Sequence, residues 1–336
     1  MNKVINLESR RYIGNKFKLK DWIFSLINEN CKGTTFADIF AGSGVISAEA
    51  LKRYKHITLN DFLYSNKIIY DAFFGRDKYS QKKILSYIDK YNSVDSGDIQ
   101  DNYFSKNFGG KYFTNNNARL IGHIREDLEK NISKLSKREF AILLTSLIYA
   151  VDRNANTVGH YDAYIKKAIP EKKLLLRPIK PFNVKRVDIY REDTNLLAKK
   201  ISADIVYIDP PYNSRQYSRF YHLLETLAKW DKQKLYGVAL KPKTENSSVY
   251  CTVRAIDAFK DLIKNLKCKY IVVSYNNTYA SKSSSSKNKI SLEQIKSVLE
   301  DKGETKVFKK NHKFFNSGKT DFDNHQEWLF ITKNYE

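Results

Sequence analysis

The stretch from Ala203 to Tyr212, ADIVYIDPPY, constrains the fold more than any other part of the chain. Its β-branched and aromatic run, Ile205 to Ile208, fits a strand that is buried on both faces of a parallel sheet. Pro210 and Pro211 end this strand, because proline cannot donate to a β-ladder. A carboxylate, a carbonyl and an aromatic ring therefore follow the carboxyl end of a strand, where open α/β sheets place their ligands.

A glycine loop precedes this strand in the chain. Thr34 to Phe40 is predicted to be a strand, and it leads directly into Ala41 to Gly44, AGSG, and then a helical stretch. Glycines let the backbone approach a ligand at a helix N-terminus. The next strand, His56 to Asn60, ends at Asp61, and an acidic residue about 20 positions beyond such a loop usually binds a ribose diol. Ser47 stands at the third glycine position of the dinucleotide fingerprint, so an adenosine ligand without a pyrophosphate is favoured.

The α/β alternation stops between Asn66 and about Lys185, which indicates a helical insertion within an α/β core. Helices are predicted there over 81–91, 117–134 and 137–152, with polar and aromatic connections such as 101–112. After the insertion, strands are predicted over 187–190, 203–208 and 269–275, and helices over 216–231, 253–266 and from the capping-box pair Ser291 and Gln294 to about 299. The helix over 216–231 is expected to pack back on the sheet. The last two strands, 306–315 and 326–333, are predicted to form an antiparallel hairpin at the sheet edge, joined by 317–324.

Charge and cysteine content limit the class of protein. The 59 Lys and Arg residues exceed the 37 Asp and Glu residues and give a net charge of +22, which favours a polyanionic partner. The three cysteines lack metal-site or disulfide spacing, so we expect a reduced cytoplasmic protein without a metal. No signal peptide is apparent, and the longest apolar run, 140–151, is too short to span a bilayer.

The Asp-Pro-Pro-Tyr motif resembles the catalytic motif of DNA adenine N6 methyltransferases, and this resemblance implies a chemical role for its residues. An exocyclic adenine amine is a poor nucleophile, because its lone pair is delocalised into the ring. Asp209 and the Pro210 carbonyl offer two fixed acceptors for its N–H groups, which would stabilise the positive charge that develops on nitrogen. Tyr212 would stack on the base, and a base within a duplex must first be flipped out.

Six segments together resemble one known family, the Dam-like class of DNA adenine N6 methyltransferases. They are DPPYNSRQY (209–217), RRYIGNK (10–16), ADIFAGSG (37–44), ITLND (57–61), REDTNLL (191–197) and IVVSYNN (271–277). They occur in the family's order and span nearly the whole chain. The resemblance implies a Rossmann-like S-adenosylmethionine-dependent core with a mostly parallel sheet, one antiparallel edge and a helical insertion.

The resemblance also implies roles for individual residues. The catalytic motif is Asp209, Pro210, Pro211 and Tyr212. The residues that match cofactor motifs are Tyr12 and Lys16 near the N-terminus, Asp38, Phe40, Gly42 and Gly44 in the glycine-loop motif, Asp61 for the ribose, Asp193 for the adenine amine, and Asp209. Asp38 is expected near the methionine amino group. Thr194 follows Asp193 where many relatives have Phe or Ala, which puts the adenine contact in doubt. His160, His222 and Glu225 are expected to be packing or helix-face residues.

The order of the segments predicts the domains and partners. Residues 1–72 and 182–336 would form the catalytic core, and 73–181 the target-recognition insertion. Lys and Arg residues there and in 282–289 are candidates for phosphate contacts. By resemblance, the partners would be double-stranded DNA and a cognate restriction endonuclease, in the cytoplasm of a bacterium.

Three alternatives stay open at this point. The same chemistry could act on the N4 amine of cytosine, although relatives with that activity more often carry Ser in place of Asp209. RNA could replace DNA as the substrate. The chain could also be a non-catalytic DNA-binding relative, against which the intact motif from Asp209 to Tyr212 argues.

Overall fold

The computed structural model describes residues 4–278, 288–311 and 325–335, and it divides the chain into two compact units. The unit that we call the sheet unit consists of Gly14–Phe62, Lys185–Tyr217 and Asn246–Glu336. The unit that we call the helical unit consists of Met1–Ile13, Leu63–Val184 and Ser218–Glu245. The predicted hairpin connection 317–324, and residues 282–287 among the predicted phosphate contacts, lie outside the described residues.

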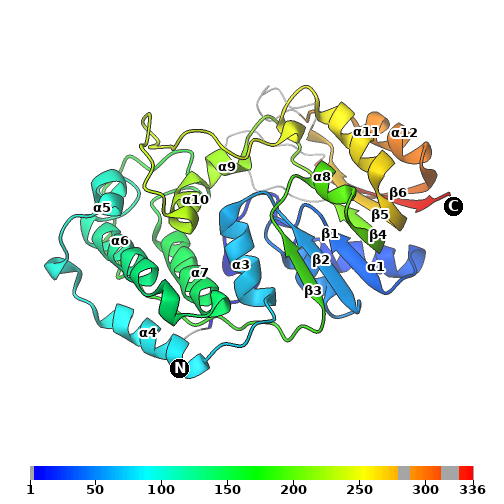
Figure 1. Ribbon diagram of the computed structural model, residues 1–336. Coiled ribbons are helices and arrows are strands. Elements are labelled where there is room, and N and C mark those ends of the chain that lie inside the picture. Colours follow the sequence, from blue (N-terminus) through cyan, green and yellow to red (C-terminus); the bar gives the residue numbers. More distant parts are fainter. Residues whose placement is uncertain (1–3, 279–287, 312–324, 336) are drawn as a thin grey trace. The chain divides into compact units, whose positions relative to one another are not determined.

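A seven-stranded sheet forms the centre of the sheet unit (Figure 1), with the order β3-β2-β1-β4-β5-β7-β6. Its strands are β1 (Thr35–Asp38), β2 (His56–Asn60), β3 (Val187–Tyr190), β4 (Ser202–Ile208), β5 (Lys267–Asn276), β6 (Gly303–Asn311) and β7 (Gln326–Asn334). The strands β1 to β5 pair in parallel, whereas β7 pairs antiparallel with both β5 and β6. The predicted Rossmann-like methyltransferase fold, with its one antiparallel edge, is confirmed.

Alternation of side chains along β1 supplies both faces of this sheet with apolar residues. Ala37 belongs to a core cluster with residues of α8 (Thr194–Ala198), α11 (Ala255–Asn265) and α12 (Leu292–Glu300). The neighbouring residue, Phe36, instead contacts the rings of Phe24, Tyr54 and Tyr207. Phe24 lies on α1 (Lys20–Asn30), and α1 also packs against α2 (Val45–Ala50). Helices therefore cover the two faces of the sheet.

Parallel pairing brings the predicted site residues to one edge of the sheet. Asp38 is the last residue of β1, and it lies opposite Leu59 of β2 and Tyr207 of β4. Asp61 and Asp209 follow β2 and β4 directly, so the three carboxylates stand at the same carboxyl edge. The β-branched run of β4 is almost completely buried, as the sequence predicts, and this fixes the position from which the two prolines leave the sheet.

The helical unit is built around α7 (Lys137–Asn154), which is buried along most of its length and packs against α3 (Tyr64–Phe74), α4 (Gln81–Ser93), α6 (Asn115–Lys130) and α10 (His222–Lys229). A capping box between Ser136 and Glu139 defines where α7 begins. Glu225 accepts hydrogen bonds from the backbone N–H groups of Tyr64 (2.9 Å) and Ser65 (2.8 Å), so it caps the first turn of α3.

Three details of the helices differ from the sequence prediction. The polar connection predicted over 101–112 contains α5 (Tyr103–Phe108), with a capping box between Asn102 and Ser105. The single helix predicted over 216–231, packed on the sheet, is wrong: it is α9 (Tyr217–Phe220) and α10, and α10 packs against α3 and α7. The helical unit also takes in 1–13, 63–72, 182–184 and 218–245, beyond the predicted insertion 73–181, whose role in target recognition stays a prediction.

Candidate active site

Asp209 begins the motif at the carboxyl end of β4. Pro210 is buried and Pro211 is partly exposed, and the ring of Tyr212 lies edge-on to Tyr275 of β5, with 4.8 Å between centroids. The backbone carbonyl of Tyr212 accepts hydrogen bonds from the Lys289 backbone N–H (2.7 Å) and the Tyr275 hydroxyl (3.4 Å). These contacts fix the motif as a rigid turn beside β5.

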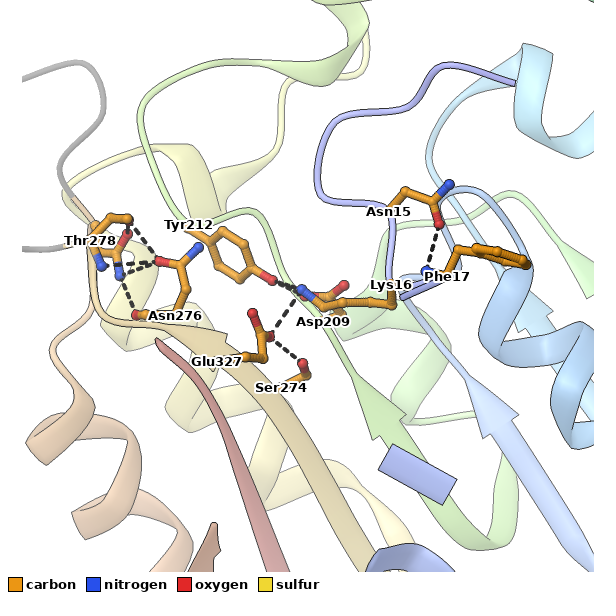
Figure 2. A network of polar contacts seen from close by, with 10 residues as sticks. Asn15, Lys16, Phe17, Asp209, Tyr212, Ser274, Asn276, Thr278 and Glu327 are labelled. Carbon is orange, nitrogen blue, oxygen red and sulfur yellow. Dashed lines mark hydrogen bonds and ion pairs between the residues drawn. The ribbon is translucent and has the colours of Figure 1, made fainter. Parts of the chain in front are cut away.

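Lys16 connects the motif to the antiparallel strand β7 (Figure 2). Its ammonium group lies 3.1 Å from Oδ1 of Asp209 and 3.0 Å from Oε1 of Glu327, and it also donates to the Tyr212 hydroxyl. Tyr212 in turn donates to Oδ1 of Asp209, and Ser274 of β5 donates to Oε1 of Glu327 at 2.5 Å. A lysine has three N–H donors, so these three partners use its full capacity.

Burial and charge act in opposite directions on this cluster. Burial alone would lower the pKa of Lys16, but the charges of Asp209 and Glu327 outweigh it, and the pKa is raised. Burial raises the pKa of Asp209, and the charge of Glu327 adds to this rise while Lys16 opposes it. One cation is therefore shared between the buried carboxylate of Glu327 and the partly buried carboxylate of Asp209, so neither carboxylate is fully neutralised.

One carboxylate oxygen of Asp38 accepts no hydrogen bond from the described residues. Its side chain is 1% exposed, and Oδ2 accepts a 2.7 Å hydrogen bond from Ser47. Among the described residues, Oδ1 of Asp38 is buried and has no hydrogen-bond partner. Burial raises the pKa of this carboxyl to about 7, although the Ser47 hydrogen bond lowers it, and Asp209 and Asp61 raise it further. A buried acceptor in this state favours a positively charged or N–H-donating ligand.

The glycine loop adopts the conformation that its sequence predicts. Gly42 and Gly44 have φ angles of 53° and 78°, in the left-handed region that favours glycine. The backbone N–H of Gly42 donates to Oδ2 of Asp61 at 2.9 Å, which connects the loop to the end of β2. The structure thus brings Asp61 and the glycine loop together, and their role as a ligand-binding pair stays a prediction.

Phe40 and Asp193, two further predicted site residues, also belong to the sheet unit. Phe40 meets Tyr250 edge-on with 5.1 Å between ring centroids. Oδ1 of Asp193 accepts hydrogen bonds from the backbone N–H groups of Asn195 (3.0 Å) and Leu196 (3.2 Å), so Asp193 caps α8. Thr194 donates to the Ile39 carbonyl at 3.1 Å. A role of Asp193 toward an adenine amine stays a prediction.

Tyr12 is the one predicted site residue that belongs to the helical unit. Its ring stacks on that of Tyr221 with centroids 5.1 Å apart, and the Arg10 guanidinium lies 4.9 Å from the Tyr12 ring centroid. Lys16 belongs to the sheet unit, so the RRYIGNK segment passes from one unit to the other. The cofactor role that was predicted for Tyr12 and Lys16 together stays a prediction.

Two members of the lysine cluster, Glu327 and Ser274, were not predicted from the sequence. Glu327 is 2% exposed and lies on β7, on the same buried face of the strand as Leu329 and Ile331. A carboxylate at an inward position of an apolar strand is the sequence signal that could have indicated it. Ser274 lies within the IVVSYNN segment, whose residue types alone suggest only a strand.

The fold and the motif after β4 together define a Rossmann-like methyltransferase. A family model described as "D12 class N6 adenine-specific DNA methyltransferase" matches residues 12–298. The chain belongs to this family, which confirms the predicted family. The match covers every predicted site residue.

Three relatives illustrate the similarity. Type II methyltransferase M.FokI of Planomicrobium okeanokoites is 37% identical over 87% of this chain and 47% of its own length. Modification methylase LlaI of Lactococcus lactis subsp. lactis is 31% identical over 80% of this chain and 46% of its own. Type II methyltransferase M.CviAII of Paramecium bursaria Chlorella virus 1 is 32% identical over 95% of this chain and 97% of its own.

The chain spans about half the length of the first two relatives and nearly all of the third. Within the described ranges, no helix is both long and apolar enough to cross a bilayer. The same residues contain no group of three or more His, Cys, Asp or Glu side chains arranged to hold a metal ion.

Proposed function

We propose that the chain transfers a methyl group from S-adenosylmethionine to N6 of an adenine that is flipped out of a short double-stranded DNA sequence. The observation that carries this proposal is the position of Asp209 to Tyr212 at the carboxyl end of β4, in a chain of the D12 family. The chain resembles type II methylases, so a cognate restriction endonuclease that cuts the same sequence is the proposed partner, in a bacterial cytoplasm.

The residues of the sheet edge fit the proposed cofactor. The unpaired Oδ1 of Asp38 suits the amino group of the methionine part. The positive φ angles of Gly42 and Gly44 let the loop backbone approach a ligand, and Asp61 suits a ribose diol. When bound, this cofactor would supply an electrophilic methyl group on a sulfonium.

Asp209 and Pro210 would activate the adenine amine. Both contacts to the Asp209 carboxylate, from Lys16 and Tyr212, fall on Oδ1. No donor to Oδ2, or to the Pro210 carbonyl, is found among the described residues, so both oxygens could accept an N–H of the amine. Because these acceptors are already in place, charge that develops on nitrogen is stabilised without reorganisation of the protein.

The two acceptors, Asp209 and the Pro210 carbonyl, also bear on whether the amine loses its proton before or after methyl transfer. The amine loses a proton only after it has been methylated, because a neutral aromatic amine holds its protons tightly, whereas the cation formed by methylation is acidic and releases one to Asp209 or to water. An ionised Asp209 is therefore needed as an acceptor before attack and as a counter-ion during it. His222 is buried, donates from Nε2 to the Tyr161 carbonyl (2.8 Å) and has its pKa lowered by burial to about 4, which suits a packing role in the helical unit.

A basic segment of the helical unit is the proposed phosphate-binding surface. Between residues 166 and 180 there are six Lys or Arg residues and one Glu, and Lys166, Lys167, Lys172, Lys173 and Lys180 are exposed. Phosphate contacts by such residues position a protein on DNA without reading its sequence. This surface lies within 73–181, so we propose that this region contributes to target recognition.

The test is transfer of labelled methyl from S-adenosylmethionine to unmethylated DNA, followed by nucleoside analysis and mapping of modified positions. N6-methyladenine at one recurring sequence is the expected result. N4-methylcytosine would overturn the assignment of the base, and label in RNA alone would overturn the assignment of the substrate. The absence of transfer to any nucleic acid would overturn the proposed activity.

A further inference from the structure

The strand β7 brings a second buried carboxylate to the catalytic motif, from a part of the chain more than a hundred residues away in sequence. Glu327 is 2% exposed and Lys16 is 5% exposed, and their charged groups are 3.0 Å apart. Burying two charges costs free energy that their attraction repays only with good geometry and further hydrogen bonds. Here Ser274 and Tyr212 supply those hydrogen bonds.

The geometry of this pair bears on one oxygen of Asp209. Lys16 holds Oδ1, together with the Tyr212 hydroxyl, and this fixes the rotation of the carboxylate about its last bond. Glu327 holds Lys16 from the other side, so the ammonium group cannot move fully onto Asp209 (Figure 2). The second oxygen, Oδ2, is thereby kept for another donor.

We propose that Glu327 and Lys16 are positioning residues that fix the Asp209 carboxylate and leave it partly unneutralised for the substrate amine. This inference rests on the proposed function, since it names the residues that prepare Asp209 for an amine. It assigns Lys16 a role toward Asp209 rather than toward the cofactor alone. It also gives β7, the antiparallel strand, a role in the reaction.

Removing either Glu327 or Lys16 should make Asp209 a poorer acceptor for the amine. Without Glu327, Lys16 would pair with Asp209 alone and would compete with the amine for its negative charge. Without Lys16, the partly buried Asp209 and the buried Glu327 would be two carboxylates with no cation between them, and their repulsion would favour protonation of one. A protonated Asp209 would lose the negative charge that stabilises the amine cation.

The first variant to test is Glu327→Gln, which keeps an oxygen for Lys16 and removes the charge. We expect kcat for methyl transfer to fall about tenfold to a hundredfold, because small displacements of a reacting group have effects of this size, while KM for DNA and cofactor changes little. Glu304→Gln, an exposed carboxylate on β6, is the matched control and should leave kcat unchanged.

The pH profile separates this role from a merely structural one. The ionisable groups around Asp209 are Lys16, Glu327, Tyr212, Tyr207 of β4, Tyr275 of β5 and Asp38 of β1. The charge of Glu327 raises the pKa of Asp209, so its removal should lower that pKa. The acid limb of the kcat profile should therefore move to lower pH in Glu327→Gln and stay in place in Glu304→Gln.

A double substitution covers the case in which one variant folds poorly. Lys16→Met leaves two unpaired carboxylates, whereas Lys16→Met with Glu327→Gln removes one of them. The double variant should unfold at a higher urea concentration than Lys16→Met alone, and the double-mutant cycle should show coupling. Additive effects on stability would mean that the two residues do not act as a pair, which would overturn the inference.

These experiments distinguish failure of this inference from failure of the proposed function. If the unsubstituted protein transfers no methyl to DNA, the proposed function fails and this inference fails with it. If the unsubstituted protein is active and Glu327→Gln has the same kcat and the same acid limb, only the inference fails.

Discussion

Asp38 offers a prediction in which stability and ligand binding change in opposite directions. Its pKa is raised from 3.8 to about 7 in the folded protein, because burial disfavours the ionised form. A raised carboxyl pKa contributes stability below pH 3.8, and that contribution is lost as the pH rises toward 7. Asparagine has no charge to bury and can still accept the hydrogen bond from Ser47. Asp38→Asn should therefore not lose this stability as the pH rises toward 7.

The magnitude follows from the same pKa. Between pH 5 and pH 7 the carboxyl is ionised in the unfolded chain and mostly protonated in the folded protein. Two pH units at about 1.4 kcal/mol each give about 3 kcal/mol. Without cofactor, the stability advantage of Asp38→Asn over the unsubstituted protein should thus be about 3 kcal/mol larger at pH 8 than at pH 5.

Urea unfolding at the two pH values, followed by circular dichroism, measures this difference. All other titrating groups are common to both proteins, so the contributions of those that do not interact with Asp38 cancel in the comparison. Asp257→Asn, which removes an exposed carboxylate on α11, controls for the change in net charge and should show no such pH dependence. A stability difference that is the same at pH 5 and pH 8 would refute the reasoning. In calorimetry, Asp38→Asn should also bind S-adenosylmethionine more weakly, because the amino group loses its anionic partner.

Three further predictions concern the same edge of the sheet and the basic segment. Asp209→Ala should abolish methyl transfer while DNA binding in a gel-shift assay stays close to normal; near-normal turnover would contradict the acceptor role. Asp61→Ala should weaken S-adenosylmethionine binding in calorimetry more than DNA binding, because the Gly42 N–H loses its acceptor, and an unchanged cofactor affinity would contradict the ribose assignment. Replacing Lys166, Lys167, Lys172 and Lys173 by Gln should reduce the slope of log affinity for DNA against log salt by about 0.9 for each phosphate that the variant no longer neutralises, and an unchanged slope would exclude this surface.

The sequence was sufficient for the features that depend on local patterns. The apolar run of β4, the two prolines after it and the glycines before α2 each restrict the backbone within a few residues. Parallel pairing then places the ends of neighbouring strands at one edge, so the proximity of Asp38, Asp61 and Asp209 could be expected from their positions after strands.

Features that depend on distant pairing could not be derived in this way. Glu327 reaches Lys16 only because β7 inserts between β5 and β6, and although the predicted hairpin gives one neighbour of β7, nothing local to Gln326–Asn334 indicates that the other is β5. The assignment of 218–245 to the helical unit likewise depends on contacts of α10 with α3 and α7. Periodicity predicts a helix in that region, but it does not say which apolar surface the helix covers.

The distribution of charge over the chain suits two kinds of partner. The net charge is +22, yet Asp38, Asp61 and Asp209 stand together at the sheet edge, and Lys16, their cationic neighbour at Asp209, is shared with Glu327. Burial, together with neighbouring carboxylates, raises the pKa of Asp38 and of Asp209 and so costs stability. That cost is explained if the edge binds groups that are positive or become positive, namely the cofactor's amino and sulfonium groups and the attacking amine. The exposed lysines of 166–180 suit the phosphates of DNA instead, so under the proposed function positive charge on the surface would attract the substrate while negative charge at the sheet edge would stabilise the reaction.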